Sequence, residues 1–114
     1  MQGKRLDRIN QLIKEEISLL LQRELKDPRL GFVTVTDVET AADLRSAKVF
    51  VSVLGDDDRW VASLAALESS RGFIRHWLRS HLDLRVTPML DFRADHSMEH
   101  AANIQALLRQ LKHE

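Results

Sequence analysis

The spacing of the apolar residues changes abruptly around Pro28, and this change constrains the fold more than any other feature of the chain. Over residues 4–25 the apolar side chains recur every three or four positions, which is the period of an amphipathic helix, at Leu6, Ile9, Ile13, Ile17, Leu20 and Leu21. Residues 32–38 are instead rich in β-branched side chains, which is typical of a strand. Because a proline disfavours helical geometry at the residue before it, the helix should end at Lys26 to Arg29. A helix therefore leads directly into a strand.

The rest of the chain predicts two further strands and three further helices. Apolar and polar residues alternate over residues 47–54, which predicts a second strand paired with the first as a hairpin. Helices are expected over residues 59–69 and 73–82, with a break at Ser70-Arg71-Gly72, then a third strand over 89–93. Residues 97–112 predict a last amphipathic helix, with Ile104, Leu107, Leu108 and Leu111 on one side. We expect an α+β fold in two layers, with the helices on one face of a three-stranded sheet.

Composition excludes several classes of protein. A length of 114 residues fits one domain, and 44% hydrophobic with 30% charged residues is a globular balance. No apolar run approaches the ~18–20 residues that a membrane span needs. The chain lacks cysteine, which excludes disulfides, thiolate metal sites and cysteine catalysis. The absence of cysteine and of a secretory signal favours a cytoplasmic protein.

Positive charge is concentrated in two stretches, although the chain holds 17 basic and 17 acidic residues and has no net charge. A neutral total does not exclude a basic face, because local potential decides which partners bind. The basic residues of these stretches are Lys4, Arg5, Arg8, Arg71, Arg75, Arg79 and Arg85.

The spacing of Arg71, Arg75 and Arg79 places all three on one face of the expected helix, where we expect Arg71 and Arg75 to be exposed. Gly72 would let a ligand approach the backbone closely, and the arginine side chain suits phosphates and stacking on bases. The alternative is an ordinary solvated helix face.

The N-terminal basic residues are harder to assign. Positive charge in the first turn opposes the helix dipole, so local stability does not explain it. Contact with RNA phosphates and a frayed, solvated helix end explain Lys4, Arg5 and Arg8 equally well.

One short segment matches a metalloprotease signature. His96-Ser97-Met98-Glu99-His100 has the letters H-x-x-E-H, which would support a small hydrolase. The segment falls at a helix start, where Glu99 is explained as an acid favoured by the dipole, and no third ligand stands out. The sequence also lacks phosphate-binding loops and serine elbows, so we predict no catalytic residue, metal or cofactor. Trp60 and Trp77 have helical spacing with other apolar residues and are interpreted as core.

Four segments of the chain have a distinctive order of residues. Residues 27–36, with Asp27-Pro28-Arg29-Leu30-Gly31, resemble the junction between helix and strand of the ribosome-binding factor A family, and residues 43–52 resemble its second strand. Residues 70–75 and 84–92 are similar to its kinked helix and third strand. Ser70 stands where the family carries the alanine of an Ala-x-Gly kink. Because serine is small and can bond a helix N-terminal amide, a kink is still expected. The element order is that of the type II K homology (KH) domain, which binds single-stranded RNA.

The resemblance implies a function in ribosome assembly. Family members bind the small (30S) ribosomal subunit and its 16S rRNA during late maturation, including processing of the 5′ region, and leave before translation. The resemblance implies a single KH-like RNA-binding domain over residues 1–114, a monomer without catalytic activity, and a role in cold adaptation. The RNA-binding residues are expected to be Lys4, Arg5, Arg8, Ser70, Arg71, Gly72, Arg75, Arg79 and Arg85. The alternative is a KH-like module that docks on a protein and touches no RNA.

Overall fold

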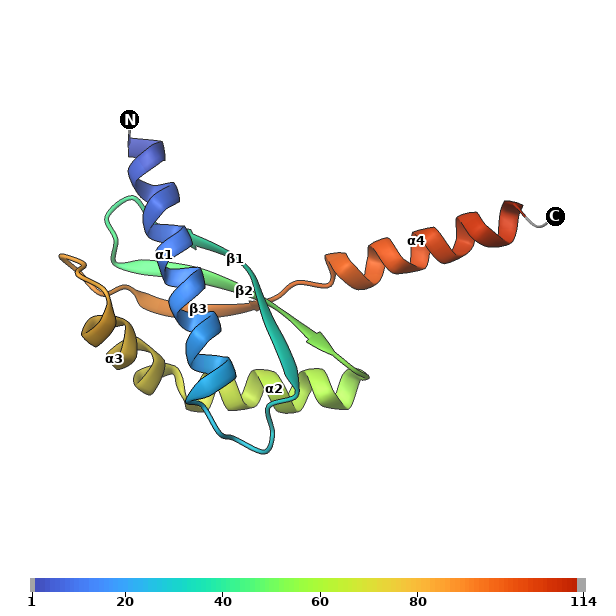
Figure 1. Cartoon of the computed structure of the whole chain (residues 1–114), viewed down its shortest axis with the longest axis horizontal. Helices are drawn as coiled ribbons and strands as arrows, with labels where there is room; N and C mark the ends of the chain where they lie inside the picture. The colour runs from blue at the N-terminus through green and yellow to red at the C-terminus, as the bar shows by residue number, and fades with distance from the viewer. Residues whose placement is uncertain (1, 113–114) are drawn as a thin grey trace.

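The computed structural model describes residues 2–112 and has the predicted element order (Figure 1). The elements are α1 (Gln2–Arg23), β1 (Phe32–Thr40), β2 (Ser46–Leu54), α2 (Asp57–Ser69), α3 (Arg71–His81), β3 (Met89–Ala94) and α4 (Ser97–Lys112). The predicted α+β class is confirmed.

The sheet has the strand order β1-β2-β3. Strands β1 and β2 form the expected antiparallel hairpin, and β3 pairs with β2 in parallel. Helices α2 and α3 make the crossover that a parallel pair requires. The register of β1 shifts between Val35 and Asp37, which leaves Thr36 as an extra residue. This bulge allows Val35 and Val38, three positions apart, to be buried on the same side.

One face of the sheet carries the core, and α1, α2 and α3 cover it (Figure 1). Along α1 the side chains of Ile9, Ile13, Ile17 and Leu20 are buried, as the helical period predicts. Strand β2 buries every second residue, from Ala47 to Val53. Packing of these alternating positions against the helical stripe fixes which face of the sheet is inside.

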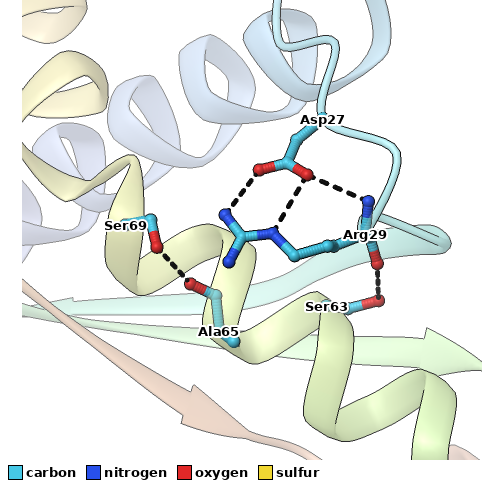
Figure 2. Close-up of polar contacts among 5 residues, drawn as sticks. All are labelled: Asp27, Arg29, Ser63, Ala65 and Ser69. Atoms are coloured by element: carbon cyan, nitrogen blue, oxygen red, sulfur yellow. Dashed lines mark hydrogen bonds and ion pairs between the residues drawn. The ribbon is translucent and has the colours of Figure 1, made fainter.

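The loop between α1 and β1 is tied to α2 by hydrogen bonds (Figure 2). The Asp27 carboxylate accepts from the Arg29 backbone N–H at 2.9 Å and from the Arg29 guanidinium at 2.7 and 3.1 Å. These hydrogen bonds from Arg29 hold the pKa of Asp27 below its usual value. The Gly31 N–H donates to the hydroxyl of Ser63 at 3.0 Å, and Ser63 is fully buried. The motif that follows α1 therefore forms a fixed corner against α2.

The predicted break between α2 and α3 is confirmed, but it is narrower than expected. Ser70 alone separates the helices, and Arg71 and Gly72 already belong to α3. The Ser70 N–H donates to the carbonyls of Ala66 and Leu67, so the backbone closes the end of α2. The kink does not depend on a side-chain cap, since among the described residues the Ser70 hydroxyl makes no cap hydrogen bond to α3.

Helix α4 differs from the expectation that every helix packs on the sheet. It projects away from the other elements (Figure 1), and its apolar side chains are exposed, Leu107 at 60% and Leu111 at 67%. The core face of the sheet is already covered by three helices, which leaves no core surface for a fourth.

The start of α4 is nevertheless held in place. The Asp95 carboxylate accepts from the Thr36 hydroxyl at 2.7 Å and from the Ser97 N–H at 2.9 Å. The buried indole of Trp60 donates to Glu99 at 2.8 Å. The direction in which α4 leaves the domain is therefore set by its first turn.

Candidate nucleic-acid interface

The N-terminal basic cluster, Lys4, Arg5 and Arg8, lies on the first turns of α1, and all three residues are exposed. The first turn of this helix holds no acidic residue that would offset their charge. With Asp7 the one acidic residue among residues 4–8, the cluster presents net positive charge to solvent, at the end of the helix where the dipole is itself positive.

Arg85 lies near Arg5 of this cluster, although the two residues are far apart in the sequence. A surface hollow of about 230 Å³ is lined by Arg5 and Arg85. Its other lining residues are Leu6, Ile9, Ala42, Asp43, Leu44 and Val86. The hollow thus joins three segments: the start of α1, the loop between β1 and β2, and the loop between α3 and β3. The structure brings together two basic groups that the sequence presents as separate.

The loop between β1 and β2 has a defined conformation. The Asp43 carboxylate accepts from the Arg45 N–H at 3.0 Å, and the Leu44 N–H donates to the Ala41 carbonyl at 2.9 Å. Leu44 has a φ of 64°, a left-handed conformation that is rare for a bulky residue. Sequence reasoning did not identify Asp43 and Leu44 as site residues. The only signal for this turn was the aspartate two positions before Arg45.

Arg71, Arg75 and Arg79 do not form a uniformly exposed row. Arg79 is exposed, but Arg71 and Arg75 are partly buried, so the expectation that both are exposed is wrong. The Arg75 guanidinium donates to the Thr87 carbonyl from Nη2 at 2.9 Å and from Nε at 3.3 Å. Arg75 therefore holds the loop that carries Arg85.

Arg71 forms an ion pair with Glu68, one helical turn before it. Its charge also contributes, after the dominant hydrogen bonds from Arg93, to holding the pKa of Asp91 below its usual value. Arg71 thus faces two acidic groups, and its charge is partly neutralised within the domain.

The kink between α2 and α3 carries only small side chains at Ser70 and Gly72. Gly72 is exposed, and a Cβ added there would meet nothing within 4 Å, while Ser70 is partly buried. The next residue, Phe73, is 50% exposed, because Ile74 and Leu78 fill the inner arc of α3. An exposed aromatic ring beside Gly72 can stack on a base, and the sequence prediction missed it.

The segment with the metalloprotease letters has a structural role in this fold. The Glu99 carboxylate accepts from Trp60 and lies 3.3 Å from Nδ1 of His96, while the His96 ring lies 4.1 Å from the Trp60 ring. In residues 2–112 no three histidine or acidic side chains gather as metal ligands would. The same part of the chain contains no helix that is both long and apolar enough to span a bilayer.

Proteins of one family are similar to nearly the whole chain. The family model described as ribosome-binding factor A matches residues 5–108. Ribosome-binding factor A of Thermomicrobium roseum is 47% identical over 114 residues, which cover 100% of this chain and 88% of the relative. The protein of the same name from Desulfitobacterium hafniense is 50% identical over 110 residues, covering 96% of this chain and 88% of the relative.

Solved structures share the fold. The crystal structure of ribosome-binding factor A from Thermus thermophilus has a TM-score of 0.70 and 24% identity, covering 78% of this chain and 94% of that one. The solution NMR structure of a Thermotoga maritima protein has a TM-score of 0.70 and 34% identity, covering 78% of this chain and 85% of that one. A homology model of Thermus thermophilus ribosome-binding factor A, fitted into a cryo-EM map of a 30S complex, has a TM-score of 0.64 and 24% identity, covering 76% of this chain and 91% of that one. The predicted KH-like architecture is thereby confirmed, and the chain belongs to the ribosome-binding factor A family.

Proposed function

We propose that this protein is an assembly factor that binds the immature 30S subunit and its 16S rRNA late in maturation, during processing of the 5′ region, and leaves before translation. Membership of the family supports the role, and the Thermus thermophilus protein fitted into a 30S complex has the same fold. The observation that carries the proposal is that Arg85 and Arg5, a member of the N-terminal basic cluster, line the same hollow at one end of the domain. Residues 1–114 would act as one RNA-binding domain.

The chemistry of this surface suits an RNA backbone. Lys4, Arg5, Arg8 and Arg85 are exposed, and their charges can each neutralise a phosphate. Arg79 adds an exposed guanidinium on α3, while Gly72 and Phe73 offer a low, partly aromatic surface at the kink. Arg75 would contribute by positioning Arg85, and Arg71 and Ser70 would contribute less than the sequence suggested.

We further propose that the protein acts by binding alone, as a cytoplasmic monomer, and has no catalytic activity. The contacts of His96 and Glu99 with Trp60 give these residues a structural role that needs no metal. Growth in the cold, when RNA refolding is slow, would depend on the protein most.

The test is the salt dependence of binding to purified immature 30S subunits. In a plot of the logarithm of the affinity against the logarithm of the salt concentration, each phosphate contact makes the slope more negative by ~0.7 for single strands. The variant with Lys4, Arg5 and Arg8 replaced by alanine should bind more weakly, with a slope flatter by ~2. A matched control replaces three exposed basic residues elsewhere, Arg23, Lys26 and Arg109. The proposal fails if both variants keep the wild-type slope.

A protein-docking module is the second candidate, because α4 exposes an apolar stripe that includes Ile104, Leu107, Leu108 and Leu111. Contacts of this kind respond little to salt. A flat salt response of the wild-type protein on 30S subunits would favour this candidate over RNA contact.

A further inference from the structure

We propose that the hollow between Arg5 and Arg85 binds a single unstacked nucleobase of the RNA, and that the two arginines contact the phosphates beside it. This inference rests on the proposed function, because it names the part of the RNA that the same surface receives. It assigns a binding role to Ala42, Asp43, Leu44 and Val86, in addition to the part that Asp43 and Leu44 play in shaping their loop.

The size of the hollow suits one ring system. Its volume of about 230 Å³ is below the ~300–1,000 Å³ of pockets that enclose a drug-sized ligand. A folded RNA helix cannot enter such a space, but a base turned out of a single-stranded loop or bulge can, and such bases are the usual targets of sequence-specific RNA recognition.

The lining has the two kinds of surface that a base requires. Leu6, Ile9, Leu44 and Val86 provide apolar contact for the ring faces, while Arg5 and Arg85 supply positive charge. Two guanidiniums disfavour a metal ion, and a free phosphate would gain nothing from the apolar side chains. Arginine can also stack on the base or bind the phosphate as a planar fork.

Asp43 adds a hydrogen-bond acceptor to the lining. One of its oxygens accepts from the Arg45 N–H, and a carboxylate can accept further hydrogen bonds. Amino groups on bases donate to carboxylates, so the hollow should prefer a base with an exocyclic amino group over uracil.

The walls are held in place before any ligand binds. Arg75 holds Thr87 in one loop, and the Met89 N–H that follows this loop donates to the Arg45 carbonyl of the other at 2.8 Å. The left-handed backbone at Leu44 costs conformational energy and persists only where its surroundings impose it, which is common at binding sites. A preformed hollow loses little entropy on binding.

The experiment fills the hollow without changing charge. Ala42 is exposed and lines the hollow, so Ala42→Trp should occupy it and weaken binding to purified immature 30S subunits by about 5- to 150-fold, the loss of one stacked base. The salt slope should stay at its wild-type value, whereas Arg5→Ala with Arg85→Ala should flatten it by ~1.4. Ala106→Trp, on the exposed face of α4, is the matched control and should bind normally.

Chemical probing of the rRNA identifies the base. One unpaired base should be protected by the wild-type protein and become reactive again with Ala42→Trp at saturating concentration. Val86→Phe is a second variant in case the tryptophan disturbs folding, since the larger side chain should also occupy the hollow without changing its charge. If both folded variants bind like the wild type and leave the same bases protected, the hollow is not a base site, although the assembly role still holds. Failure of the wild-type protein to bind 30S subunits would instead refute the proposed function.

Discussion

Replacing Asp95 with asparagine should destabilise the domain and remove part of its dependence on acid pH. Hydrogen bonds from the Ser97 side chain, the Thr36 hydroxyl and the Ser97 N–H lower the pKa of Asp95 from 3.8 to about 2. These contacts join β1 to the start of α4, so the carboxylate is an anchor for that helix.

The size of the effect follows from the pKa. One pKa unit corresponds to ~1.36 kcal/mol, so the full shift would amount to ~2.4 kcal/mol. Asp95 is partly exposed, and solvent weakens such interactions, so we expect Asp95→Asn to lower the free energy of unfolding by about 1–2 kcal/mol at pH 7.

The sign of the pH dependence is fixed by the direction of the shift. Because the folded-state pKa is depressed, the stabilisation is complete well above pH 3.8 and is lost as the pH falls through about 2. The difference in unfolding free energy between wild type and Asp95→Asn should therefore be constant from pH 7 to about pH 5 and shrink between about pH 4 and pH 2.

Urea denaturation followed by tryptophan fluorescence measures this difference, since Trp60 contacts the first turn of α4. Asp83→Asn changes an exposed loop carboxylate and is the matched control, with an expected effect within ~0.5 kcal/mol. If Asp95→Asn is as stable as the wild type at pH 7, or if the difference persists unchanged at pH 2, the anchoring role is refuted.

Three further substitutions test the fold and the interface. Ile13→Ala should reduce the free energy of unfolding by ~2–5 kcal/mol in urea titrations, because Ile13 is fully buried in the core. Ser63→Ala should reduce it by ~1–3 kcal/mol, because the Gly31 N–H loses its acceptor, and an unchanged thermal midpoint would contradict this. Arg79→Glu should weaken binding to 30S subunits without loss of stability, whereas Arg75→Glu should reduce both, since it releases the Thr87 carbonyl. If Arg79→Glu and Arg75→Glu have the same affinity for 30S subunits and the same melting temperature, Arg75 does not have the separate role of holding the Thr87 loop.

Most of the fold could be predicted because the core depends on local periodicity. The three- and four-residue spacing from Ile9 to Leu20 and the alternation from Ala47 to Val53 are properties of single segments, and both pack as predicted. The position of α4 could not be predicted in this way. Its apolar stripe has the same spacing as that of α1, but whether a stripe finds a partner depends on how much of the sheet other helices already cover.

The candidate site was predicted only in part. Sequence patterns identify basic residues, but the proximity of Arg5 and Arg85 depends on how α1 crosses the sheet and where β3 begins. The role of Arg75 was missed for a similar reason, because a helix face that carries charge looks the same whether it meets solvent or a backbone carbonyl such as that of Thr87. The left-handed turn at Leu44 has no glycine to signal it.

Sedimentation of a cell extract through a sucrose gradient shows whether the protein binds free small subunits in the cell. The protein should migrate with free small subunits, should be absent from assembled ribosomes, and should move to the top of the gradient when Lys4, Arg5 and Arg8 are replaced by alanine. A wild-type protein that stays at the top of a low-salt gradient, or that migrates with assembled ribosomes, would refute a role in small-subunit assembly.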